Sequence, residues 1–394
     1  MDTKNIQRRY DLDWLRVLGI LAVFLFHSTR FFDFGDWHVK NPFTYVPAVA
    51  LQSFMTIWMM PLMFLVSGAS IYYAMDKGGA GKFLKDKVLR LLVPLLVAMF
   101  SYGALQVYLE RVTHGQFNGS FWAFIPHYFE GMYGFGGNFA WIGMHMWYVL
   151  VLFVYCLLFY PLFRWWKGSA ALAKIGDILA FPWTRWLALA VPIVVLAIFI
   201  SDTAWEAGAG GWGFLYYSFF LFYGFVIVAS ERLQANIQRT RWTYLVVGLI
   251  LAAAYTFLAV NVDNPAIEPL EDAYGDLLYV LSACTLLPAI LGFGMQHLTK
   301  NTPFLKYAGE AVMGFYILHQ TVLLVVGYFV LQWDLSGLAK WAIIAVTSFG
   351  LIMAIYEFLI RRVNVLRFLC GMKTITKSKA VAASENVLAE AKSH

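Results

Sequence analysis

The stretch DLDWLRVLGILAVFLFH, residues 11–27, begins with two acids and an arginine, continues through ten uncharged residues and ends on a histidine. Its apolar part is typical of a membrane-spanning helix. Ionisable side chains within such helices are energetically costly and usually face a cavity or a partner. A simple anchor gains nothing from His27, so the stretch predicts a spanning helix with a further role.

The rest of the chain repeats the apolar pattern. Of its 394 residues, 61% are hydrophobic and only 13% are charged, whereas soluble proteins carry about 25% charged residues. A helical span needs roughly 20 mostly apolar residues. We therefore expect an all-α, polytopic membrane protein with about ten transmembrane helices. The segments are 14–32, 52–74, 88–109, 146–164, 186–201, 212–230, 242–261, 274–296, 309–332 and 338–360.

The basic residues predict an orientation for these helices. With the N-terminus inside, 25 of the 29 Lys and Arg residues fall on the inner side, as expected because cytoplasmic loops collect them. Both termini are therefore predicted to be cytoplasmic. The net charge of +6 follows from this bias and from anionic lipid at that surface, so it requires no nucleic acid. The outer basic residues are Arg30, Lys40, Arg111 and Lys340.

The domain organisation is simple. Residues 1–372 read as one membrane domain, and residues 373–394 as a polar, mobile cytoplasmic tail. The aromatic outer loop 110–145 either forms an interfacial belt or offers a surface to a sugar, and a second outer loop, 262–276, is acidic. Three isolated cysteines indicate no disulfide framework and no metal site; they are Cys156, Cys284 and Cys370. We expect no permanently bound cofactor.

Arg16 and His27 share one face of the first predicted helix. Eleven residues separate them, which places them within roughly 20° around the helix and about 16 Å apart along it. Taken alone, Arg16 also fits a snorkelling residue of the positive-inside pattern, and His27 also fits a histidine bonded between helices. Their common face favours a functional pair.

Three other ionisable residues lie in predicted spans. His319 is expected at a depth similar to that of His27, so the two histidines can share a cavity; haem ligation is a competing use. Glu357 pairs either with Arg361 one turn away or across helices with Arg16 or Arg90. Two arginines at a cytoplasmic mouth would suit phosphate groups, because the guanidinium fork matches them.

This geometry suggests a phosphorylated donor whose reactive end reaches inward, and acyl-coenzyme A has that shape. Histidine would act either as a general base on an acceptor hydroxyl or as a nucleophile that takes the acyl group. The sequence has no Walker A loop, G-x-S-x-G elbow or H-E-x-x-H motif. This argues against an ATP-driven pump, an α/β-hydrolase and a zincin.

Six stretches in order along the chain together resemble the acyltransferase-3 family of integral-membrane enzymes, which move acyl groups onto carbohydrates. The first matches that family's Arg-x10-His signature, the second its Phe-x-x-Ser-Gly core and the third its Arg-x-x-Arg entrance to a helix. The stretches are LDWLRVLGILAVFLFH, PLMFLVSGASIYY, KVLRLLVP, HMWYVLVLF, FYILHQTVL and YEFLIRRVNVLRFLCG. By DWHVKNP and the last helix, the chain is most similar to the osmoregulated periplasmic glucan succinyltransferases.

The resemblance implies a multi-pass protein of the bacterial inner membrane that uses cytoplasmic succinyl-CoA or acetyl-CoA and a periplasmic glycan acceptor. It implies catalytic roles for His27 and His319, and donor binding by Arg16, Arg90 and Lys87. Lys87 stands where the family has an arginine and lacks its bidentate fork. The expected supporting residues of the cavity are Glu357, Ser67, Trp147 and Arg30, the last as a partner for a succinyl carboxylate.

Other functions remain open at this stage. A small-molecule or glycan transporter explains the helices and buried charges equally well, but not the shared face of Arg16 and His27 or the lack of inverted repeats with broken helices. An acyltransferase of the same family acting on another surface glycan is a further alternative. The sequence leaves the oligomeric state undetermined.

Overall fold

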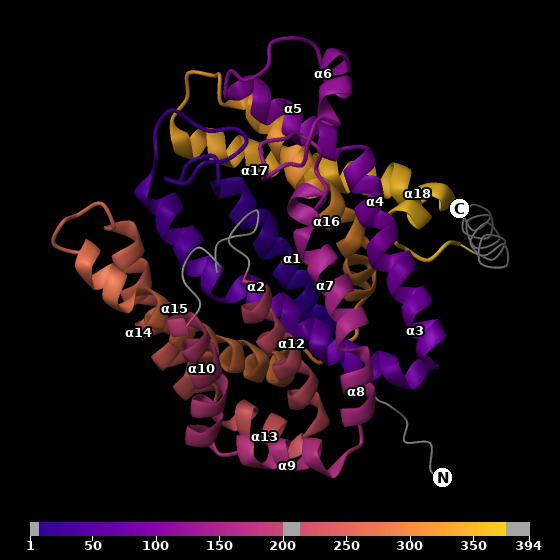
Figure 1. Ribbon diagram of the computed structural model, residues 1–394, viewed down its shortest axis with the longest axis vertical. Helices are drawn as coiled ribbons and strands as arrows, with labels where there is room; N and C mark the ends of the chain where they lie inside the picture. The colour runs from indigo at the N-terminus through magenta and orange to yellow at the C-terminus, as the bar shows by residue number, and fades with distance from the viewer. Residues whose placement is uncertain (1–7, 200–212, 376–394) are drawn as a thin grey trace, which may run out of the picture.

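The computed structural model describes residues 8–199 and 213–375, and Figure 1 shows them as helices joined by loops. Within those residues the only β pairing is an isolated bridge between Met132 and Phe139. The first half contains α1 (Tyr10–Thr29), α2 (Val46–Ala74), α3 (Ala80–Lys87), α4 (Val93–Phe100), α5 (Gly103–Thr113), α6 (Phe121–Tyr128), α7 (Trp147–Leu158), α8 (Tyr160–Trp166), α9 (Ala170–Leu179) and α10 (Pro182–Phe199). The second half contains α12 (Phe214–Ala229), α13 (Glu231–Arg239), α14 (Arg241–Val260), α15 (Glu268–His297), α16 (Pro303–Val330), α17 (Gly337–Ile355) and α18 (Asn364–Leu369).

The all-helical membrane architecture predicted from the sequence is confirmed, but the expected count of ten spans is not. Six described helices are long and apolar enough to cross a membrane, and up to nine spans result if each bent pair counts as one. The predicted segment 88–109, for example, is bent by 41° between α4 and α5. The segment 186–201 corresponds to α10, but its last two residues, and residue 212 of the next segment, lie outside the described residues.

The bundle is built around α1 and α2. α1 packs against α2, α15, α16 and α17, and α2 packs closely along α12. At Gly68 and Gly224 an added Cβ would lie 1.9 Å and 1.8 Å from backbone oxygens of the facing helix. Small residues let spanning helices approach this closely. Gly68 of the predicted Phe-x-x-Ser-Gly motif therefore has a packing role.

The aromatic segment 110–145 is an ordered cap. It contains the end of α5, the short helix α6 and a loop that returns to α7, at the top of Figure 1. Its side chains form a hydrophobic cluster separate from that of the bundle, with Phe124, Tyr128, Ala140 and Met144 buried. The cap thus rests on α5 and lies over the end of the bundle that carries His27.

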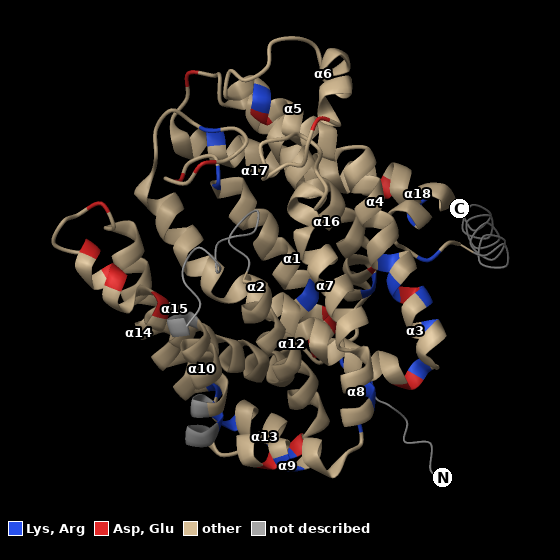
Figure 2. Cartoon of the chain, viewed as in Figure 1, with Lys and Arg blue, Asp and Glu red and all other residues tan. Residues whose placement is uncertain are grey.

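Two predicted loops differ in the structure. The acidic segment 262–276 is a loop only in its first part, because α15 begins at Glu268 with Pro269 at its start, a favoured position for proline. Of the tail 373–394, only residues 373–375 are described, and the Asn364 side chain hydrogen-bonds the backbone of Ile375. Figure 2 marks Lys and Arg positions along α3, at α8 and around α9 and α13.

Candidate active site

His27 and His319, predicted from two distant motifs, are in direct contact. His27 lies near the end of α1 and His319 in the middle of α16, and the two helices pack together. Their rings are 5.0 Å apart between centroids, and His319 Nε2 lies 3.4 Å from His27 Nδ1. His319 is only 1% exposed. The direct contact leaves no room for a porphyrin between the rings, which argues against haem ligation.

The hydrogen bonds assign one set of tautomers to this pair. His27 Nδ1 lies 2.8 Å from the Val23 carbonyl, so it carries the proton and donates there, with His319 Nε2 as a second acceptor. His319 Nδ1 donates to the Tyr316 carbonyl. His27 Nε2 is therefore the unprotonated nitrogen of its ring. A histidine held in this way presents a base whose opposite nitrogen is already partnered.

A third histidine, His145, joins the pair. Its ring centroid lies 4.8 Å from that of His319, and its Nε2 donates to the carbonyls of Tyr316 and Ile317, each at 3.1 Å. The sequence motif HMWYVLVLF contained this residue, but only Trp147 was selected from it as a site residue. The signal for His145 was present, because it is an ionisable residue at the start of a predicted span.

Uncharged amides continue the network away from the histidines. Gln106 on α5 donates to Thr321 at 2.7 Å and to His145 Nδ1 at 3.2 Å, and it accepts from Gln320 at 3.0 Å. Gln106 and Gln320 are both buried. The amides fix α5 against the turn of α16 that carries His319. Sequence reasoning missed both glutamines, since an uncharged amide in a span does not stand out.

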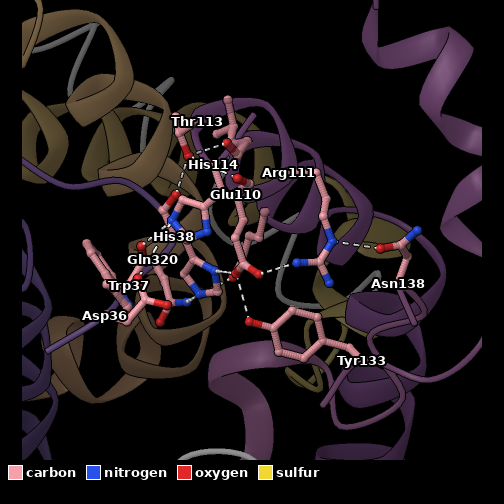
Figure 3. Close-up of polar contacts among 12 residues, drawn as sticks. Asp36, Trp37, His38, Glu110, Arg111, Thr113, His114, Tyr133, Asn138 and Gln320 are labelled. Carbon is pink, nitrogen blue, oxygen red and sulfur yellow. Dashed lines mark hydrogen bonds and ion pairs between the residues drawn. The ribbon is translucent and has the colours of Figure 1, made fainter. Parts of the chain in front are cut away.

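The network ends in a charged cluster beneath the cap (Figure 3). Gln320 donates to His38 Nε2 at 3.1 Å, and the opposite nitrogen of His38 pairs with Glu110, whose side chain is buried. Arg111 and Tyr133 donate to the same carboxylate at 2.9 Å and 2.7 Å. Burial and then the adjacent carboxylate raise the pKa of Tyr133, so its phenol remains a donor. This cluster ties the first loop, α5 and the cap to α16.

Arg16 lies at the other end of α1, in a more open environment. Its side chain is 35% exposed, donates to Ser70 Oγ of α2 at 2.6 Å and lies 3.4 Å from Asp13. Arg16 and His27 are thus both turned toward neighbouring helices, α2 and α16 respectively. Part of the guanidinium is left accessible to a ligand.

The two other predicted donor-binding residues lie on the segment that leads into α4. Lys87 ends α3, with its ammonium 5.1 Å from the ring centre of Phe83. Arg90 is exposed and lies on a π-helical turn, Val88–Leu92; such turns are frequent at functional sites. Arg16 itself contacts Ser70 and Asp13, and a shared role of Arg16, Lys87 and Arg90 in donor binding stays a prediction.

Glu357 follows the simpler of its two predicted arrangements. It also lies on a π-helical turn, Tyr356–Ile360, where both of its oxygens accept from Arg361 at 2.9 Å. Its contact across helices is with Tyr307 at 3.0 Å. Pairing of Glu357 with Arg16 or Arg90 is therefore wrong in this structure.

Ser67 and Trp147 connect α2 to α7. Ser67 Oγ lies 2.6 Å from the hydroxyl of Tyr148, and the Trp147 ring lies near Phe64 and Tyr217, with centroids 6.3 Å and 5.5 Å away. Both motif residues thus contribute to a packed junction of α2, α7 and α12.

Arg30 is held by groups of its own loop. It pairs with Asp33, donates to the Asp36 carbonyl at 2.7 Å, and shares Asp33 with Lys40. Because these groups already occupy its guanidinium, the arrangement disfavours a role as partner of a succinyl carboxylate.

The comparisons with known proteins agree with this geometry. A family model described as an acyltransferase domain matches residues 9–357. Proteins named glucans biosynthesis protein C, from Salmonella heidelberg (strain SL476) and from Salmonella typhi, are each 21% identical over 97% of this chain and 100% of the relative. No solved structure matches the chain. Since the family model covers nearly the whole chain, from the start of α1 to the end of α17, the protein belongs to the acyltransferase-3 family of membrane acyltransferases.

Proposed function

We propose that this protein transfers an acyl group, succinyl or acetyl, from cytoplasmic acyl-CoA to a hydroxyl of a periplasmic glycan, with His27 as the catalytic base. The acyltransferase family supports the reaction class. The glycan is inferred from the relatives named for glucan biosynthesis. Both termini face the cytoplasm in this proposal, which the distribution of basic residues supports.

The contact between His27 and His319 is the observation that carries the proposal. Because His27 Nδ1–H donates to Val23 and faces His319 Nε2, the lone pair of His27 Nε2 is available for a substrate hydroxyl. When that nitrogen accepts a proton, the positive charge is shared by two acceptors already in place. Such fixed partners avoid reorganisation during the reaction.

The proposed reaction passes through a tetrahedral intermediate. The glycan oxygen attacks the thioester carbonyl carbon while His27 Nε2 removes the hydroxyl proton. The tetrahedral intermediate collapses with cleavage of the carbon–sulfur bond. The imidazolium returns the proton to the departing sulfur, which gives an ester and free coenzyme A. In this proposal Arg16, Lys87 and Arg90 bind the phosphates of the donor on the cytoplasmic side.

The direct test measures acyl transfer by purified protein with radiolabelled succinyl-CoA or acetyl-CoA and a glucan mixture. His27→Ala is expected to lower transfer by about 10²- to 10⁴-fold, the usual contribution of a general base. The matched control is His127→Ala, because His127 is half exposed and its imidazole pairs with Glu130 on the cap surface.

Two results would contradict the proposal. If the folded His27→Ala variant transfers acyl groups at the wild-type rate, His27 is not the catalytic base. Label that crosses the bilayer of proteoliposomes without joining a glycan would favour transport over acyl transfer.

A further inference from the structure

Arg185 on α10 is a buried cation without a counter-ion. Its side chain is 1% exposed. Nε donates to the Tyr244 hydroxyl at 2.8 Å and Nη2 to Thr240 Oγ1 at 3.1 Å, while Nη1 is buried without a hydrogen-bond partner. Both partners are neutral hydroxyls, and within the described residues no carboxylate lies within ion-pair distance of Arg185.

The position of Arg185 increases the need for a negative charge. Thr240 precedes the 20-residue helix α14, and its side chain does not cap that helix. The first N–H groups of a helix are unsatisfied and carry the positive end of its dipole. A buried guanidinium is destabilising unless it is compensated. The Tyr244 ring, 4.7 Å from Arg185 Cζ, supplies part of that compensation, and an anion at the helix start would supply the rest.

A second unpartnered arginine nitrogen lies at the same helix start. Arg241 is the first residue of α14, and its buried Nε also lacks a hydrogen-bond partner. Its guanidinium lies 5.5 Å from the ring centre of Phe293 on α15. Arg239, two residues earlier, is exposed. The junction of α13 and α14 therefore concentrates positive charge.

The protein surface next to this junction carries exposed apolar side chains. Trp242 and Val246 on α14 are 60% and 55% exposed, and Phe181 at the start of α10 is also exposed. An exposed tryptophan beside arginines at the end of a spanning helix is typical of the membrane–water interface. These exposed apolar side chains would form the lipid-facing wall of a site at Arg185, whose own side chain is buried.

We propose that Arg185, Arg241 and the first turn of α14 bind the phosphate of an anionic phospholipid. The phosphate would accept from Arg185 Nη1 and the free backbone N–H groups, and the acyl chains would lie along Trp242 and Val246. Basic pockets between helices on the cytoplasmic side commonly hold such headgroups, and that side is the one predicted for the 164–185 and 232–241 segments.

The test measures binding to the full-length protein in neutral detergent, by native mass spectrometry and by the shift of the melting temperature. Phosphatidylglycerol is the probe, with inorganic phosphate and coenzyme A in separate arms. Phosphatidylglycerol is expected to bind and to raise the melting temperature. Arg185→Gln is expected to lower its affinity by about tenfold or more, the value of a charge-assisted hydrogen bond. Arg164→Gln, at an exposed arginine of α8, is the control.

Several outcomes would overturn the proposal. Equal lipid affinity in Arg185→Gln and Arg164→Gln would mean that the guanidinium is merely hydrated. If inorganic phosphate or coenzyme A shifts the melting temperature and Arg185→Gln removes that shift, the site binds a soluble anion instead of a lipid. If Arg185→Gln fails to fold, Arg241→Gln replaces it, with a smaller loss expected. None of these measurements depends on acyl transfer, so they are independent of the proposed reaction.

Discussion

The two ends of α1 differ in how completely their polar groups are satisfied. At the His27 end, three histidines, two glutamines and the buried pair of His38 and Glu110 form one network in which each described donor faces an acceptor. At the Arg16 end, the guanidinium of Arg16 is partly exposed, with Ser70 and Asp13 as its partners. One end is preorganised, and the other leaves a cation accessible.

This difference fits the two tasks of an acyltransferase. A proton must be removed at a fixed position, which requires partners that are set before the substrate arrives. A donor with a flexible phosphorylated head needs only accessible cations, because exposed charge pairs contribute little stability by themselves. The comparison predicts that changes at the His27 end affect folding and turnover, whereas changes at the Arg16 end affect donor affinity.

The largest effect is expected for Glu110→Ala. Removal of one partner from a buried ion pair costs about 3–5 kcal/mol, because the other charge remains buried, and here Arg111, His38 and Tyr133 all lose their shared acceptor. The melting temperature of the purified protein measures it. Glu130→Ala, at an exposed carboxylate that pairs with His127, should leave it nearly unchanged. Equal shifts would show that the cluster beneath the cap is not a stabilising unit.

A smaller effect is expected for His319→Ala. Loss of His319 Nε2, the second acceptor of His27 Nδ1 beside the Val23 carbonyl, should reduce kcat by about 10²-fold, at the low end of general-base contributions, with KM for acyl-CoA little changed. Steady-state kinetics separate the two constants. The control is His297→Ala, at the exposed end of α15. A change confined to KM would make His319 a donor-binding residue instead of a positioning residue.

At the opposite end, Arg16→Ala is expected to weaken coenzyme A binding by about tenfold, the value of one charge-assisted hydrogen bond, and to alter the melting temperature little. Calorimetric titration with coenzyme A measures the affinity. Arg239→Ala removes an exposed arginine of α13 and should not change it. Equal losses of coenzyme A affinity in the two variants would mean that Arg16 contributes only to the positive-inside charge distribution and does not bind the donor.

The smallest effect is expected for Glu357→Gln. Its ion pair with Arg361 is partly exposed, and such pairs contribute about 0–1 kcal/mol. The melting temperature of the purified variant should therefore change little. A loss as large as that of Glu110→Ala would indicate that Glu357 has a partner beyond Arg361, Arg362 and Tyr307.

Some features of the site were readable from the sequence because they break a strong pattern. His27, His319 and Arg16 stand out in apolar helices, where ionisable groups are costly. Gln106, Gln320 and His38 do not stand out in this way, since amides and loop histidines are compatible with many environments. Their importance follows from neighbours that lie far away in the chain, such as Gln106 and Thr321.

The sequence by itself determined the helical membrane architecture and the two histidines, because hydrophobic length and the cost of buried charge act on each segment separately. Tertiary structure alone decided the direct contact of His27 with His319, the inclusion of His145 and the breaks within spans. These depend on which helices pack together and in what register, and local patterns along a chain do not encode that.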